Sequence, residues 1–304
     1  MARIINFGSI CIDSVLQVPH LVAAGETLRA DSLQRLPGGK GLNQSLAAAR
    51  AGAEVIHVGR VGRDGVDLRA LLADAGVNVD AVEVLEDVPT GHAFIQVDAR
   101  GENSIVILPG ANRGMPASIL DVVEQALRPG DWLLLQNETD WVPEVMQRAG
   151  SRGARVALNI APAEAAARDW PLEEVALFVL NETEAALITG EFTPAAQLLA
   201  IAERAPTAIV ALTLGAQGAV LASGRQGPDG GAAIQVPPFT VDVVDATGAG
   251  DAFTGALVAG LASGLGAEAA VVRANAAGAL ACTRLGAGVA IPDAAAIDAL
   301  LAAS

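Results

Sequence analysis

The strongest constraint on the fold of this chain is a repeated alternation of short, continuous apolar runs with longer helical segments. The runs are RIINFGS (residues 3–9), EVIHVGRVG (54–62), DWLLLQ (131–136), RVALNI (155–160), ALFVL (176–180) and AIVALTL (208–214). Helical patterns lie at 40–52, 64–76, 141–149, 181–189 and 194–205, and the first two end at Gly52 and Gly76. Continuous apolar strands are typical of a parallel sheet covered on both faces. The order predicts one doubly wound, mainly parallel α/β domain.

Two inserts, residues 13–37 and 90–109, break this rhythm, because apolar and polar residues alternate in them as in half-buried strands. The run HAFIQVDARGENSIVIL (92–108) predicts a hairpin that turns at Arg100–Gly101–Glu102. We expect the inserts to pair as a small sheet over one edge of a main domain made of residues 1–12, 38–89 and 110–304. The Gly-rich stretch 224–233 predicts a hairpin loop.

Composition and charge exclude several classes of protein. The 304 residues carry a net charge of −15, whereas nucleic-acid binding needs a basic surface, so we expect no nucleic-acid partner. The only cysteines, Cys11 and Cys282, are too few for a disulfide framework. The stretch MARIINFGSI is too short and too polar for a signal peptide, and no run approaches the ~20 apolar residues of a membrane-spanning helix. We expect a cytoplasmic protein without a membrane partner.

The stretch DATGAGDAF (245–253) places a carboxylate directly after a segment that is almost bare backbone. The following residues predict a helix that ends at Gly264, so Gly248, Ala249, Gly250 and Asp251 would form its first turn. Free N–H groups at a helix start favour anions, and glycine lets a phosphoryl group approach the backbone closely. Asp251 could accept a proton from a substrate hydroxyl, as phosphoryl transfer requires, or it could simply cap the helix.

A second glycine-rich loop, LPGGKGLNQSLAAAR (36–50), also runs into a helix. It is not a P-loop, because Gln34 stands where the first glycine of that motif belongs and Gly41 follows Lys40. Lys40 and Asn43 lie on the first helical turn and are suited to bind sugar hydroxyls. The alternative is an ordinary helix start led by glycine.

A third stretch, NETEAALITG (181–190), places Asn181 and Glu184 on one face of a helix start. Such a pair could organise a hydrated Mg²⁺, which takes few protein ligands, or it could be a capping arrangement. His20, His57 and His92 have no ligand spacing, and we expect them to be structural or surface residues.

Together and in this order, these stretches resemble the ribokinase (PfkB-type) family of sugar kinases, and the resemblance covers nearly the whole chain. It implies an α/β/α sandwich with a small β-sheet lid. It also implies ATP as phosphoryl donor and Mg²⁺. Asp251 would be the catalytic base toward a terminal hydroxymethyl, and the amides of Gly248, Ala249 and Gly250 would form an anion hole. The motifs that carry it are GSICID (8–13), GGKGLNQ (38–44), GAN (110–112), NIAPA (159–163), NETEA (181–185), TLGAQG (213–218), DATGAGDAFTGAL (245–257) and TRLGAG (283–288).

The resemblance also assigns roles to single positions. Its sugar contacts would be Asp13, Gly39, Lys40, Asn43 and Glu138, with Asn181 and Glu184 near the phosphates and Mg²⁺. The nucleotide site would include Thr213, Gly215, Gly218 and Asn275. A monovalent cation, usually K⁺, would be held by Asp245, Thr247 and the loop containing Arg284, Gly286 and Gly288.

Three positions depart from the family's usual pattern. Cys11 stands where many bacterial ribokinases have Asn, Ala246 replaces the usual Thr or Pro, and Ala290 replaces a Ser near the cation loop. The retained Lys40 places D-ribose first as substrate, with fructose, 2-keto-3-deoxygluconate or an adenosine-like nucleoside as alternatives. A catalytically silent sugar- or nucleotide-binding regulator is a third hypothesis. A nicotinamide-dependent oxidoreductase is disfavoured, because FGSICID lacks G-x-G-x-x-G.

The two inserts also suggest an assembly. We expect the lid to mediate a homodimer, because a small sheet would otherwise expose apolar residues such as Phe94, Ile105 and Ile107 on the face turned away from the sugar.

Overall fold

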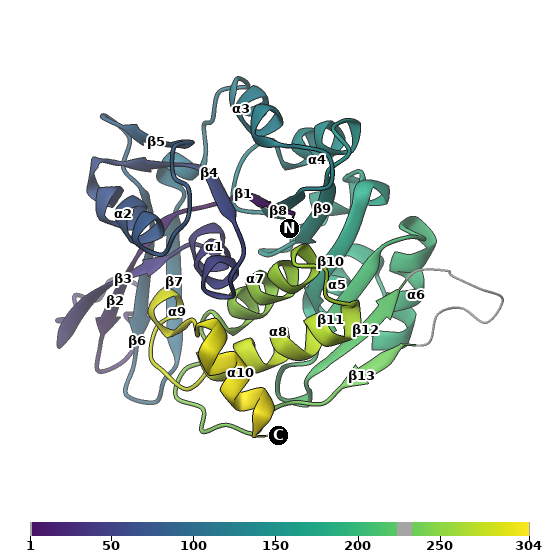
Figure 1. The fold of residues 1–304 in the computed structure, drawn as a ribbon. Coiled ribbons are helices and arrows are strands. Elements are labelled where there is room, and N and C mark those ends of the chain that lie inside the picture. The colour runs from purple at the N-terminus through teal and green to yellow at the C-terminus, as the bar shows by residue number, and fades with distance from the viewer. Residues whose placement is uncertain (1, 224–232, 304) are drawn as a thin grey trace.

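The computed structural model describes residues 2–223 and 233–303, and it has the three-layer α/β/α architecture expected from the sequence (Figure 1). In the described residues, a large sheet has the strand order β13-β12-β11-β10-β9-β8-β1-β4-β5 and a small sheet the order β3-β2-β6-β7. The strands are β1 Ile4–Phe7, β2 Cys11–Gln17, β3 Ser32–Gly38, β4 Val55–Gly62, β5 Val82–Leu85, β6 Gly91–Val97, β7 Asn103–Leu108, β8 Trp132–Gln136, β9 Arg155–Asn159, β10 Val175–Asn181, β11 Ile209–Thr213, β12 Ala219–Ser223 and β13 Ile234–Val236. The helices are α1 Lys40–Arg50, α2 Val66–Asp74, α3 Ile119–Ala126, α4 Val142–Ser151, α5 Glu182–Thr189, α6 Pro194–Arg204, α7 Ala249–Ala262, α8 Ala267–Ala281, α9 Ala287–Ala290 and α10 Ala294–Ala302.

The large sheet is parallel from β5 to β11 and turns antiparallel only at β12 and β13. β1 lies inside the sheet between β4 and β8, so the chain winds outward from it in both directions, which confirms the doubly wound prediction. The hairpin loop predicted at 224–233 lies almost entirely outside the described residues, while the strands that flank it pair antiparallel.

Two separate apolar cores cover the two faces of the large sheet, which explains its continuous apolar strands. One core takes side chains from α1, α2, α7, α8 and α10, and the other takes them from α3, α4, α5 and α6. Helix α7 is built largely from Ala and Gly and is buried almost throughout. Its Gly255 lies against α1, where an added Cβ would come 2.6 Å from the Gln44 carbonyl oxygen. This close approach brings the start of α7 beside the polar residues of α1.

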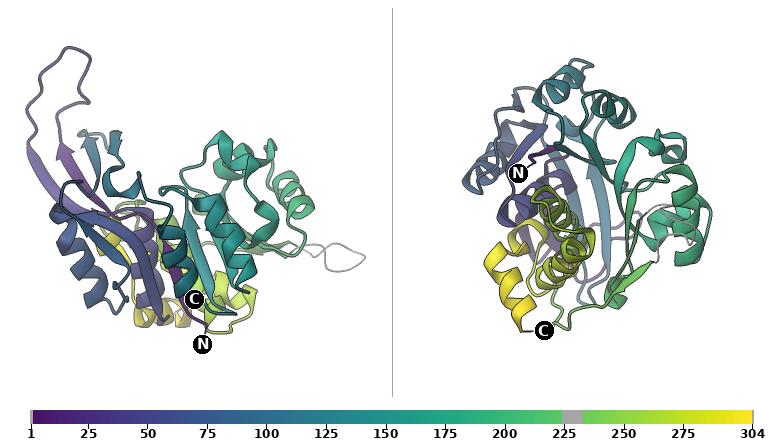
Figure 2. Two further views of the ribbon diagram at one scale, coloured as in Figure 1. Left: turned by 90° about the horizontal axis from the view of Figure 1, so that it is seen from above. Right: turned by 45° about the vertical axis from the view of Figure 1, so that its right-hand side comes forward.

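The small sheet is formed by the two inserts, with β2 parallel to β6 and antiparallel pairs at both edges. The predicted 92–108 hairpin is therefore confirmed. The small sheet begins at Cys11 and its strand β3 ends at Gly38, slightly outside the first insert. The chain between β2 and β3 extends away from the rest of the molecule (Figure 2, left).

The expectation that Phe94, Ile105 and Ile107 lie together on the outer face of the small sheet is wrong. Ile105 pairs with Ile95 and Ile107 with Ala93, so they share the face that lines a cavity over the main domain. Phe94 pairs with Val106 on the opposite face. Because side chains alternate along a strand, Phe94 cannot share a face with Ile105 and Ile107. The outer face instead presents Leu33, Phe94, Val106 and Leu108, all partly open to solvent.

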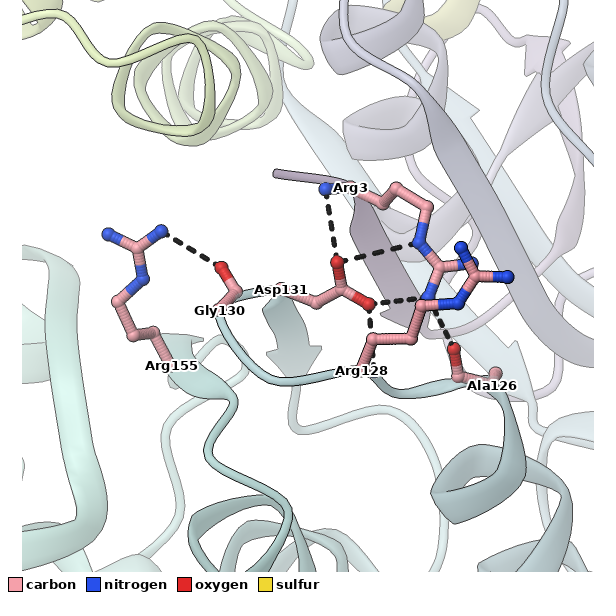
Figure 3. Close-up of polar contacts among 6 residues, drawn as sticks. All are labelled: Arg3, Ala126, Arg128, Gly130, Asp131 and Arg155. Atoms are coloured by element: carbon pink, nitrogen blue, oxygen red, sulfur yellow. Dashed lines mark hydrogen bonds and ion pairs between the residues drawn. The ribbon is translucent and has the colours of Figure 1, made fainter. Parts of the chain in front are cut away.

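The amino edge of the parallel strands is closed by polar contacts (Figure 3). Asp131, just before β8, accepts from the Arg3 backbone N–H at 3.2 Å and forms a buried ion pair with the Arg3 guanidinium. It also accepts from the Arg128 backbone N–H, while Arg155 donates to the Gly130 carbonyl. These contacts join the starts of β1, β8 and β9.

No single helix in the described residues is long and apolar enough to cross a membrane. Helices α5 and α6 reach the required length and composition only as a pair, and they are bent by 52° at their junction.

Candidate active site

A cavity of about 440 Å³ lies between the small sheet and the carboxyl edge of the large sheet. The apolar residues Ala93, Ile95, Ile105 and Ile107 form its wall on the small sheet. All five residues predicted to contact a sugar line this cavity: Asp13, Gly39, Lys40, Asn43 and Glu138. The larger cavity therefore combines an apolar wall with a set of polar groups, as small-molecule sites do.

A smaller cavity of about 190 Å³ lies next to it, over the ends of β9, β10 and β11. It is lined by Asn181, Glu184 and Thr213, which were predicted to lie near the phosphates and the nucleotide. Lys40, Gly248 and Asp251 line both cavities. These three residues therefore lie at the junction of two binding spaces.

Asp251 does not cap its helix, so the capping hypothesis is wrong, because no side chain makes a cap hydrogen bond at the start of α7. The carboxylate instead accepts from Asn43 Nδ2 and from Gln44 Nε2, each at 2.9 Å, and Asp251 is only 8% exposed. Burial raises the pKa of this carboxyl, while the Lys40 charge and the Asn43 and Gln44 hydrogen bonds lower it. A buried carboxylate with one protein donor on each oxygen retains lone pairs for a substrate proton.

The start of α7 leaves backbone N–H groups without helical partners at the junction. Gly248, the N-cap, has φ 79°, a left-handed conformation that favours glycine. A Cβ added at Gly250 would meet no protein atom within 4 Å, so a side chain there would occupy the space of the cavity. Of the three amides predicted to form an anion hole, that of Ala249 donates to the Ala246 carbonyl at 3.2 Å. The N–H groups of the two flanking glycines are thus the better candidates.

Lys40 supplies the positive charge of the junction. Burial lowers the pKa of its ammonium, but the carboxylates of Asp251, Glu138, Glu184 and Asp13 raise it, and the net direction is upward. The side chain therefore stays charged in the neutral pH range. A cation that reaches both cavities can neutralise a phosphoryl group as well as contact a sugar, which is a broader role than the sequence suggested.

The larger cavity is lined by further carboxyl groups, and Glu138 and Asp13 are the two that were predicted to contact a sugar. Glu138 accepts from the Lys40 backbone N–H at 3.0 Å and from the Ser9 hydroxyl. Burial raises the pKa of Asp13 to about 7, and the Glu138 and Asp251 charges add to the rise while Lys40 opposes it. Asp13 can therefore donate as well as accept hydrogen bonds near neutral pH.

Asn181 and Glu184 form a capping box at the start of α5, and they also line the smaller cavity. The Asn181 side chain accepts from the Glu184 backbone N–H at 2.8 Å, and the Glu184 carboxylate accepts from the Asn181 backbone N–H at 3.0 Å. The capping alternative thus describes their local structure. It leaves open a second role in which Glu184 binds a cation through water.

Metal-binding clusters of three or more His, Cys, Asp or Glu side chains are absent from residues 2–223 and 233–303. The histidines are placed as structural or surface residues. His57 is fully buried, whereas His20 and His92 pair with Glu26 and Asp64.

The predicted cation loop is held together by the Asp245 carboxylate. It accepts from the Thr247 backbone N–H at 2.9 Å and, across the loop, from the Gly286 N–H at 2.8 Å. The Gly288 carbonyl, one of the predicted ligands, already accepts from the Arg50 guanidinium at 3.3 Å. The Arg284 side chain is exposed. Asp245 thus joins the two segments that border the start of α7.

The residues predicted for the nucleotide site lie at the end of β11, in the turn that follows it and in the middle of α8. Thr213 ends β11 and lines the smaller cavity, whereas Gly215 and Gly218 form the turn that follows and line neither cavity. Gly218 has φ 88°, and a Cβ there would collide with the Val236 carbonyl oxygen. Asn275 lies in α8 and donates to the Pro237 carbonyl at 2.6 Å. The structure therefore brings only Thr213 of this set to the cavity.

Four polar residues of the site lie within motifs quoted above but received no role from the sequence: Ser9, Gln44, Asn112 and Asn159. Asn112 accepts from the Ile10 backbone N–H and donates to the Cys11 sulfur at 3.3 Å, so it anchors the start of β2. Gln44 donates directly to the Asp251 carboxylate. Their side chains act on partners far away in the sequence, and this explains why spacing did not single them out.

The two cavities meet at a buried carboxylate, an ammonium and a glycine-rich helix start. They can hold a phosphoryl donor on one side of the carboxylate and an alcohol acceptor on the other. This is the arrangement that a phosphotransferase needs, because its catalysis consists of positioning and charge stabilisation.

Comparison with known proteins agrees with this class. The family model of pfkB family carbohydrate kinases matches residues 1–294, and the chain belongs to this family. It is 36% identical to the ribokinase of Bacillus subtilis over 306 residues (99% of this chain, 100% of the relative). It is 34% identical to the ribokinase of Haemophilus influenzae over 293 residues (94% of each chain). The structure of Arabidopsis thaliana ribokinase complexed with ribose and ATP superposes with a TM-score of 0.85 at 29% identity, covering 99% of both chains.

Proposed function

We propose that this carbohydrate kinase transfers the γ-phosphoryl group of ATP to the terminal hydroxymethyl of D-ribose, giving ribose 5-phosphate. The observation that carries the proposal is the position of Asp251 at the junction of the two cavities. Two relatives that cover nearly the whole chain at 34% and 36% identity are ribokinases, and a ribokinase structure at 29% identity is complexed with ribose and ATP. They support ribose over the alternative sugars and nucleosides.

In the proposed reaction, the sugar lies in the larger cavity and its hydroxymethyl points at Asp251. The Asp251 carboxylate takes the hydroxyl proton while the sugar oxygen forms a bond to the γ-phosphorus and the bond to the leaving ADP oxygen breaks. The backbone N–H groups of Gly248 and Gly250, together with the Lys40 ammonium, stabilise the charge on the phosphoryl oxygens. The small residues at the helix start are needed because a side chain at Gly250 would fill this space.

Sugar recognition is assigned to the polar wall of the larger cavity. Asp13 and Glu138 bond sugar hydroxyls, and Asp13 can use its proton as a donor near neutral pH. Asn43 keeps a buried side-chain oxygen without a hydrogen-bond partner, Oδ1, which is suited to accept from a sugar hydroxyl. Cys11 lines the same cavity and offers only a weak S–H donor. Discrimination between sugars that differ at the hydroxyls next to Cys11 should therefore be weaker.

The residues present fit the ions that phosphoryl transfer uses. Glu184 lines the smaller cavity with both carboxylate oxygens already hydrogen-bonded, which suits Mg²⁺ held through water rather than directly. When bound, Mg²⁺ would neutralise charge on the phosphates. A K⁺ site at Asp245 and the carbonyls of Thr247, Arg284 and Gly286 is also proposed. Arg50 already places a positive charge at the Gly288 carbonyl.

We further propose that residues 13–37 and 90–109 act as a lid over the sugar and that lids of two chains pair in a homodimer. The wall formed by Ile105 and Ile107 over the larger cavity supports the first role. The apolar outer face that carries Phe94 and Val106 supports the second. Because the reaction consumes ATP, we keep the cytoplasm as the proposed location.

An ADP-release assay with a panel of sugars and nucleosides tests the function. D-ribose should give the highest kcat/KM among D-ribose, 2-deoxyribose, D-arabinose, D-fructose and adenosine. A deoxy sugar that leaves a buried polar partner unpaired should lose about 10–150-fold in kcat/KM. A higher kcat/KM for another compound would make that compound the assigned substrate in place of ribose. The absence of substrate-dependent ADP release with every compound would favour the catalytically silent regulator.

A further inference from the structure

Behind the catalytic carboxylate lies a buried network of polar side chains that connects α1 with four strands of the large sheet, β1, β4, β8 and β9. It runs from Asp251 through Gln44 and Gln136 to Asn6, Ser45 and His57, with Asn159 as a branch. Gln44, Ser45, Asn6 and His57 are completely buried and Gln136 is 1% exposed. Buried polar groups of this kind are costly unless they are hydrogen-bonded in one consistent arrangement, and in this network Gln136 Oε1 is the side-chain atom that lacks a partner.

The side-chain amide of Gln44 is fixed at both ends. Its Nε2 donates to Asp251 Oδ1 at 2.9 Å and to Asn159 Oδ1 at 3.0 Å, and its Oε1 accepts from Gln136 Nε2 at 2.7 Å. A rotated amide would place Oε1 against the carboxylate of Asp251 and the carbonyl of Asn159, and Nε2 against the NH₂ group of Gln136. All three contacts would then be repulsive, so a single orientation presents the N–H groups to the base.

The orientation of Gln136 is fixed in turn. Its Nε2 also donates to Asn6 Oδ1 at 3.0 Å, and Asn6 Nδ2 donates to Ser45 Oγ at 2.8 Å. Ser45 lies 2.8 Å from His57 Nδ1, and His57 Nε2 lies 3.2 Å from the Gly8 carbonyl oxygen. A carbonyl only accepts, so Nε2 carries the proton and Nδ1 accepts from the Ser45 hydroxyl.

His57 remains neutral in this arrangement. Burial lowers its pKa to about 4, and the Gly8 hydrogen bond opposes the decrease only in part. His57 therefore carries no charge in the neutral pH range. Starting from the Gly8 carbonyl, which can only accept, each hydrogen bond along the network determines which group donates in the next one, as far as Asp251.

We propose that Gln44 is the positioning residue of the catalytic base Asp251, and that Gln136 and the network behind it fix the Gln44 amide with its N–H group facing the carboxylate. The inference rests on the proposed function of Asp251. Neither Gln44 nor Gln136 lines either cavity. They therefore act on the reaction through Asp251 and not through substrate contacts.

Two consequences separate this role from a structural one. A hydrogen bond to a carboxylate favours its charged form, so loss of the Gln44 donor leaves burial less opposed and raises the pKa of Asp251. The carboxylate also loses the partner that orients Oδ1, while Asn43 still holds Oδ2. The pH range of activity and the maximal rate should both change.

The first test replaces Gln44 by Met, which is similar in volume and cannot donate. With ribose and ATP saturating, Gln44→Met should lower the maximal kcat by about 10–100-fold and move the acid limb of the kcat–pH profile upward by about one to two pH units. The KM for ATP should stay within about twofold of wild type. Gln136→Leu, which leaves Gln44 in place but frees its amide, should move the limb in the same direction by a smaller amount.

Gln197 provides a matched control, because it is also a buried glutamine, 1% exposed, and its Nε2 donates to the backbone carbonyls of Glu182 and Glu191 instead of to Asp251. Gln197→Met should reduce the free energy of unfolding and leave the kcat–pH profile at its wild-type position. A wild-type profile for Gln44→Met, or an equal shift in Gln197→Met, overturns the proposal.

A measurement without turnover distinguishes failure of this inference from failure of the proposed function. At pH 8, denaturant unfolding should show that Asp251→Asn stabilises the Gln44→Met chain more than it stabilises the wild-type chain, because the carboxylate has lost a donor in that background. At pH 4 the difference should shrink as the carboxyl group is protonated. Equal effects in both backgrounds at pH 8 would refute the positioning role even if the wild-type protein is an active ribose kinase.

Discussion

Asp251 lies in the first turn of α7, yet its two oxygens accept from Asn43 and Gln44 of α1 instead of capping its own helix. Asp251→Asn keeps the size of the side chain and removes the carboxylate that we propose as the base. We expect kcat to fall by about 10²–10⁴, the usual contribution of a positioned base, with little change in the KM for ATP. Steady-state kinetics checks this, and a variant that keeps more than about a third of the wild-type kcat contradicts the assignment.

Asp13 should link protein stability to pH. Burial raises its pKa to about 7, above the ordinary value of 3.8, so the folded state holds this proton more tightly than the unfolded chain does. Its contribution to stability is therefore complete below pH 4 and is lost as pH rises toward 7. We expect Asp13→Asn to raise the free energy of unfolding by about 1–3 kcal/mol at pH 8 and by almost nothing at pH 4.

Denaturant titrations of ligand-free protein at the two pH values provide the measurement for Asp13. The same variant should raise the KM for ribose more than the KM for ATP, because Asp13 lines only the larger cavity. An unchanged kcat/KM for every sugar would contradict the assignment of Asp13 as a sugar contact.

At the scale of the structural elements, the Asp245 side chain holds together the loop that precedes α7. Its carboxylate accepts from Thr247 and from Gly286, and so it links the approach to α7 with the segment before α9. We expect K⁺ to raise kcat relative to Na⁺ or Li⁺, and Asp245→Ala to remove that difference. Equal wild-type rates in the three salts would contradict the K⁺ site. They would indicate that the Arg50 charge at the Gly288 carbonyl takes the place of a monovalent cation in this loop.

At the scale of the whole molecule, the outer face of the lid bears the apolar side chains that a partner would cover. Phe94 is 43% and Val106 63% exposed on that face. If two lids pair, Val106→Glu should convert a dimer into a monomer in sedimentation equilibrium at micromolar concentration. Leu199→Glu is the control, because Leu199 is exposed on α6, away from the lid, and this change should leave the mass unaltered. A monomeric wild-type chain would refute the dimer.

The sequence by itself determined the α/β architecture and singled out the Asp251 carboxylate. Apolar periodicity is a local property, so the runs at 131–136 and 155–160 predicted β8 and β9 to within a residue or two. The glycine-rich run before Asp251 also marked a helix start, because backbone freedom and free amides depend on neighbouring residues alone.

Only the tertiary structure decided what the side chains at the site contact. The partners of Asp251 lie 207 and 208 positions away, on a different helix, and no spacing in the chain connects them. The face on which Phe94 lies depended on strand register, and the pKa of Asp13 depended on burial beside Glu138 and Asp251. Hydrogen bonds, register and desolvation are properties of the packed chain, whereas apolar periodicity and glycine runs are already present in the unfolded one.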